Sequence, residues 1–93
     1  MTSKEKIKKF IDEASTFLGN NLTSDDSDFK SWNNSLIRFC ENYYGINSTT
    51  TNLFKKRYYT LSIIFMDTKQ SEYVEAFETD LKTTIADLKR LYE

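Results

Sequence analysis

The sequence contains no histidine and no proline, only two glycines, Gly19 and Gly45, and a single cysteine, Cys40. Without histidine, the chain lacks the commonest general base and the commonest metal ligand of proteins. One cysteine cannot form a disulfide within the chain, and two isolated glycines cannot make a glycine-rich phosphate loop. We therefore expect a protein that is not an enzyme and that uses no cofactor or metal.

An excess of one charge and a long apolar run are also missing. The chain has 13 Lys and Arg against 14 Asp and Glu, which gives a net charge of −1. A protein that binds nucleic acid strongly normally carries a basic excess. No apolar run is long enough to span a bilayer, and no signal-peptide core follows the lysine-rich start. We expect no transmembrane segment, a cytoplasmic location and no small-molecule substrate.

Helical periodicity is the main positive signal. Apolar residues recur at spacings of three and four in four segments, and each glycine follows one of them. The expected helices span residues 3–18, 28–44, 51–66 and 71–92. Residues 58–65 are also rich in strand formers, but the helical neighbours and the missing hairpin turns favour a helix there. The sequence thus predicts the all-α class and a small antiparallel four-helix bundle.

The 93 residues suffice for one domain, which we assign to residues 1–93 and which would also suit the N-terminal module of a longer protein. Its expected core consists of the large apolar residues on the inner stripes of the four helices. These are Phe10, Phe17, Phe29, Trp32, Leu36, Phe39, Leu61, Phe65, Phe77, Leu81, Ile85 and Leu88.

Two tyrosine pairs, Tyr43/Tyr44 and Tyr58/Tyr59, provide the candidate interface. Adjacent helical residues project about 100° apart, so both members of a pair cannot face the bundle centre. Tyrosines at the periphery are favoured in protein interfaces. A tyrosine that lies along a bundle groove with its hydroxyl in water explains the pattern equally well. We expect Tyr44 and one of Tyr58 or Tyr59 to contribute to a contact surface.

A basic cluster, Lys55, Lys56 and Arg57, precedes Tyr58 and Tyr59. Basic residues beside aromatic ones can hold a phosphate backbone and stack on bases, so these three are candidate phosphate contacts. The alternative is that they form the solvated face of an amphipathic helix. Because the chain has no basic excess, nucleic-acid binding is the less favoured of the two interpretations.

Part of the sequence resembles a helical segment found in bacterial antiphage and abortive-infection proteins. The resemblance covers about forty residues and rests on Phe29, Trp32, Phe39, Tyr44-Gly45, Ser48 and Phe54. In that family the segment precedes a TIR-like or other nucleotide-binding effector domain, its aromatic residues serve packing, and it assembles or regulates the effector. The resemblance therefore implies an assembly or regulatory module of a bacterial or phage defence system. This chain contains no such effector domain.

From these observations we expect a non-catalytic helical module for protein–protein interaction or self-assembly. The first alternative is a small four-helix immunity protein that acts against a bacteriocin, since such proteins share this length and layout. The second alternative is a weak nucleic-acid-binding bundle. An exposed apolar groove together with membrane-associated behaviour would favour the immunity protein. Stable self-association, or an effector domain encoded in frame downstream, would favour the defence module.

Overall fold

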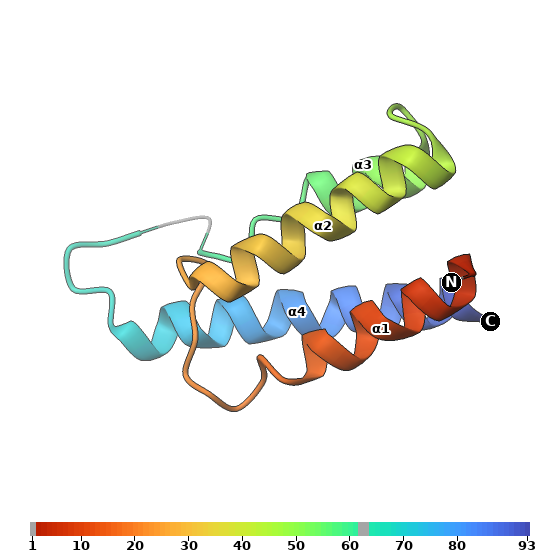
Figure 1. The fold of residues 1–93 in the computed structure, drawn as a ribbon. Helices are drawn as coiled ribbons and strands as arrows, with labels where there is room; N and C mark the ends of the chain where they lie inside the picture. Colours follow the sequence, from red (N-terminus) through yellow and green to blue (C-terminus); the bar gives the residue numbers. More distant parts are fainter. Residues whose placement is uncertain (1, 62–63) are drawn as a thin grey trace.

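The computed structural model describes residues 2–61 and 64–93, and within them it contains four helices and no strand. The helices are α1 (Ser3–Ser15), α2 (Ser27–Tyr44), α3 (Thr49–Lys55) and α4 (Gln70–Tyr92). Figure 1 shows α1 and α4 side by side and antiparallel, with α2 lying across them and the short α3 returning beside α2. The predicted all-α class and the small antiparallel four-helix bundle are confirmed.

The first three helices begin where a polar side chain caps the backbone. The side-chain oxygens of Thr2, Asp26 and Ser48 each accept a hydrogen bond from the backbone N–H three residues later, at 3.1, 2.9 and 3.1 Å. Such bonds satisfy one of the unpaired N–H groups at a helix start. The loop after α1 is fixed differently, because Gly19 has a φ of 78° and donates its N–H to Glu78 on α4 at 2.8 Å.

The prediction of a third helix over residues 51–66 is wrong beyond Lys55, where α3 ends. Residues 56–61 and 64–69 form neither helix nor strand, and positions 62 and 63 lie outside the described residues. The reason is Tyr59, which has a φ of 60° and is only 1% exposed. Its backbone N–H donates to Asp80 on α4 at 3.0 Å. A left-handed residue held in this way cannot continue a right-handed helix.

The core forms around an aromatic hub at Phe29. The ring of Phe29 lies 4.8 Å from Tyr59 and 4.8 Å from Phe77 between ring centroids, and both contacts are edge-to-face. One side chain of α2 therefore joins the segment after α3 to α4. Many of the predicted core residues are buried, as expected: Phe29, Trp32, Leu36, Phe77, Leu81, Ile85 and Leu88.

Other members of the predicted core lie further out. Phe10, Phe17 and Phe39 are partly buried and pack against the core, and Leu61 is also partly buried. Phe65 is 67% exposed, so its assignment to the core is wrong. The end of α3 at Lys55 explains this error, because Phe65 is not on a helix. Tyr59 instead fills the core position beside Phe29.

Candidate functional site

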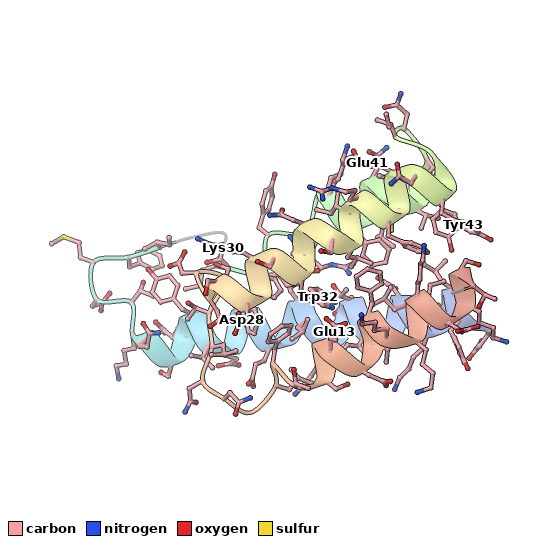
Figure 2. All side chains as sticks on the ribbon, in the orientation of Figure 1. Glu13, Asp28, Lys30, Trp32, Glu41 and Tyr43 are labelled. Carbon is pink, nitrogen blue, oxygen red and sulfur yellow. The ribbon has the colours of Figure 1, made fainter. Side chains whose placement is uncertain are left out.

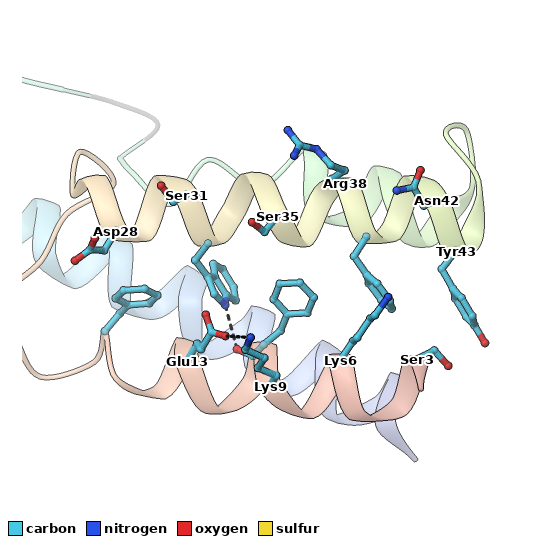
Figure 3. A pocket seen from close by; sticks show the side chains of 14 residues that line it. Ser3, Lys6, Lys9, Glu13, Asp28, Ser31, Ser35, Arg38, Asn42 and Tyr43 are labelled. Atoms are coloured by element: carbon cyan, nitrogen blue, oxygen red, sulfur yellow. Dashed lines mark hydrogen bonds and ion pairs between the residues drawn. The ribbon is translucent and has the colours of Figure 1, made fainter. Parts of the chain in front are cut away.

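An open groove of about 970 Å³ runs between α1 and α2. Figure 2 shows the two helices with all their side chains, and Figure 3 shows the groove from close by. Four aromatic side chains form its floor: Phe10 from α1, Phe17 from the turn that follows α1, and Trp32 and Phe39 from α2. The first helix was expected to reach residue 18 but ends at Ser15, so Phe17 reaches the floor from a turn. We call this feature the α1–α2 groove.

A hydrogen bond between the helices fixes the floor of the α1–α2 groove. The indole Nε1 of Trp32 donates to the backbone carbonyl of Phe10 at 3.1 Å, and Trp32 is only 4% exposed. The same indole meets the rings of Phe10 and Phe17 edge-to-face, at centroid distances of 6.3 and 6.1 Å. A floor held by these contacts is preorganised, which lowers the entropy cost of binding a partner.

Tyr43 stands at one end of the groove. It is 58% exposed, and its ring is parallel to that of Phe39 at a centroid distance of 5.7 Å. Tyr44 is partly buried behind it and meets Tyr43 edge-to-face at 4.8 Å. Burial raises the pKa of the Tyr44 phenol above its ordinary value. The structure thus places Tyr43 in the lining of the groove, and Tyr44 contacts Tyr43 without lining the groove itself.

Charge changes sign along the rim of the groove. Asp28 and Glu13 lie towards one end, and Lys6 and Arg38 lie towards the other, as Figure 3 shows. Lys9 lies between them, with its Nζ 3.9 Å from Glu13. Charged residues on an amphipathic helix ordinarily form its solvated face, so the sequence pattern alone does not group these residues into the rim of a groove. The groove therefore has an acidic half and a basic half.

The second tyrosine pair does not line this groove. Tyr58 is 77% exposed, which agrees with the expectation that one member of the pair is peripheral. Tyr59 is 1% exposed, and its hydroxyl is 2.8 Å from that of Thr84, so its assignment to an interface is wrong. Of the four candidate interface residues, the structure gathers Tyr43 and Tyr44 and leaves Tyr58 on a different surface.

The basic cluster is largely engaged within the molecule. Lys55 pairs with Glu41 on α2 at 2.7 Å. Arg57 pairs with Asp87 on α4 at 3.0 Å, and both side chains are only 13% exposed. Lys56 is exposed. A phosphate would have to displace an internal carboxylate to reach Arg57, so this arrangement disfavours the cluster as a phosphate contact.

Cys40 is fully buried on the inner face of α2. Burial, and secondarily the charge of Glu41, raise the pKa of its thiol to about 11. The thiol therefore stays protonated at neutral pH, whereas a reactive cysteine needs an accessible thiolate. This geometry gives Cys40 a packing role.

We expect Cys40 to resist an aromatic disulfide reagent in the folded protein at pH 8 and to react fully in concentrated urea. We also expect a pH effect on stability. Because the thiol pKa is higher in the folded state, the unfolded state loses the proton first. The free energy of unfolding should therefore be level below about pH 9 and fall as the pH rises towards about 11. Rapid labelling of the native protein would contradict this account. Cys40→Ala should make the alkaline slope shallower, and the part that remains comes from Tyr44 and Tyr59, whose pKa values burial also raises.

A second, smaller hollow of about 550 Å³ lies between residues 60, 61, 65 and 68 and the first half of α4. Leu61 and Phe65 line it, and the adjacent Met66 is fully exposed. Within residues 2–61 and 64–93, no three Cys, Asp or Glu side chains are grouped to hold a metal ion. The larger α1–α2 groove, with its fixed aromatic floor, is therefore the stronger candidate site.

Comparison with known proteins gives no match: no family model, no curated protein and no solved structure matches this chain. None of the helices in the described part of the chain combines the length and apolar character needed to cross a membrane. The interpretation of the groove accordingly rests on the residues that form it.

Proposed function

We propose that this protein is a non-catalytic interaction module that binds an amphipathic helix of a protein partner in the α1–α2 groove. The observation that carries the proposal is the preorganised aromatic floor, fixed by the bond from Trp32 to Phe10 and bordered by charges of both signs. Grooves of this kind bind the apolar face of a helix while polar groups at the rim set its orientation.

The shape of the groove supports a helix in preference to a small molecule. Its lining extends along α2 from Asp28 to Tyr43. At 1.5 Å per residue this corresponds to about 22 Å, or roughly four helical turns. A small-molecule site would instead be a closed concave pocket with a few converging polar groups. An elongated open trough fits a chain segment better.

The two alternative functions, nucleic-acid binding and immunity against a bacteriocin, are not equally compatible with the structure. A nucleic-acid-binding bundle is disfavoured, because Lys55 and Arg57 are held in internal ion pairs. An immunity protein against a bacteriocin remains the second candidate, since an exposed apolar groove suits it as well. Binding to lipid vesicles together with the bacteriocin would favour that candidate. Within our proposal, the resemblance noted above makes assembly or regulation of a defence effector the biological role.

Selection from a random helical-peptide library on the immobilised protein tests the proposal without a known partner. We expect enriched peptides to be amphipathic, because the floor is aromatic and the rim is charged. Tyr43→Ser should weaken their binding about fivefold or more, since a tyrosine that anchors an interface contributes over about 1 kcal/mol. Isothermal titration calorimetry with a selected peptide measures the effect.

The matched control is Tyr58→Ser, which removes an even more exposed tyrosine that does not line the groove. It should leave peptide affinity unchanged. Failure to enrich any peptide, or equal effects of the two substitutions, would mean that the groove is not the binding surface.

A further inference from the structure

The exposed face of α2 along the groove carries a symmetric pattern. Asp28, Ser31, Ser35 and Arg38 are all exposed and line the groove. Their spacings are three, four and three residues, so all four share one side of the helix. An acidic residue begins the pattern, a basic residue ends it, and two small hydroxyl residues lie between.

This pattern is complementary to itself when two helices run in opposite directions. Asp28 and Arg38 are equally distant from position 33, and so are Ser31 and Ser35. A second copy of α2, antiparallel and centred there, places each Asp28 opposite Arg38 of the other copy. Each Ser31 then lies opposite Ser35. The small serines allow the two helices to approach closely, because the side chains at a contact set the distance between helix axes.

The neighbouring helix α1 repeats the same polarity. Lys6 lies on the same half of the groove as Arg38, and Glu13 lies on the same half as Asp28 (Figure 3). In the antiparallel arrangement, the acidic half of each copy therefore meets the basic half of the other on both helices. A parallel arrangement would place like charges together, which is unfavourable.

We propose that the polar face of α2 beside the α1–α2 groove packs against the same face of α2 in a second copy of this chain, in a two-fold symmetric antiparallel dimer. This inference goes beyond the proposed function, because the contact uses the polar face of α2 and not the aromatic floor of the groove. A two-fold interface uses one surface patch on both subunits, and that patch must be complementary to itself. The charge pattern of α2 and α1 meets this requirement.

Charge reversal tests the dimer and its orientation. The acidic variant carries Lys6→Glu and Arg38→Glu, and the basic variant carries Glu13→Lys and Asp28→Lys. We expect sedimentation equilibrium of the wild type at low salt to show a dimer whose affinity falls with added salt. Each variant alone should dimerise at least about tenfold more weakly, because like charges then face each other. An equimolar mixture of the two variants should restore the dimer.

The matched control reverses two exposed charges on α4, Lys82→Glu and Lys89→Glu, and should dimerise like the wild type. Circular dichroism verifies that all variants remain helical. A wild type that stays monomeric at millimolar concentration overturns the inference, and so does a mixture that fails to associate. Neither outcome affects the peptide selection, which tests the proposed function separately.

Discussion

Replacing Phe29 by alanine is expected to lower the free energy of unfolding by about 3–5 kcal/mol, the usual cost of truncating a buried aromatic residue. Phe29 is 2% exposed and contacts the rings of Tyr59 and Phe77 at 4.8 Å each. Its ring also lies 6.0 Å from that of Phe17, in the turn just after α1. Truncation would open a cavity where several segments of the chain meet.

Urea denaturation followed by far-UV circular dichroism measures this loss. The control is Phe65→Ala, which removes the same ring from a position that is 67% exposed. A surface truncation of this kind ordinarily changes stability by less than about 0.5 kcal/mol. Equal losses in the two variants would show that the hub at Phe29 has been misidentified.

The second large effect is expected at the ion pair between Arg57 and Asp87. The Asp87 carboxylate accepts from Arg57 at 3.0 Å, and the same guanidinium donates to the Thr84 hydroxyl at 2.8 Å. This cluster attaches the segment after α3 to α4. Asp87→Ala should destabilise the fold by about 3–5 kcal/mol, because it leaves a nearly buried guanidinium without its counter-charge.

Replacing both partners tests whether the lost counter-charge causes the effect. The double variant Arg57→Met with Asp87→Leu should recover most of the stability, since neither charge is then buried alone. A control is Asp12→Ala, which removes an exposed pair formed at the same 3.0 Å distance with Lys8. Its urea midpoint should match the wild type. A double variant as unstable as Asp87→Ala would contradict this explanation.

Local signals predicted most of the fold. Capping residues and apolar spacing placed α2 and α4 to within a residue at each end, because these helices bury a continuous stripe. The end of α3 was not predictable in the same way. It depends on Tyr59, which is held by Asp80 more than twenty residues away, and the local pattern of residues 58–65 contains no sign of that contact. The wrong assignments of Tyr59 and Phe65 both follow from the prediction that the third helix continues past Lys55.

The candidate site was only partly predictable. The aromatic stripe of α2 indicated which residues pack, and the consecutive tyrosines indicated a surface near Tyr43. The charged rim was missed because each of its residues alone fits a solvated helix face. Its signal is the symmetric spacing from Asp28 to Arg38 on α2. That spacing indicates a contact surface only when the structure also shows that α1 and α2 leave an open groove between them.

Amide NMR spectra of the wild type, recorded from micromolar to millimolar concentration, test most directly whether two copies of the chain meet along α2 beside the α1–α2 groove. We expect concentration-dependent shifts along the groove face of α2, from Asp28 to Arg38, and at Lys6 and Glu13 on α1. Phe65 and Met66, which lie outside the groove, should keep their positions. Spectra that do not change with concentration, or changes centred on Phe65 and Met66, would contradict the account.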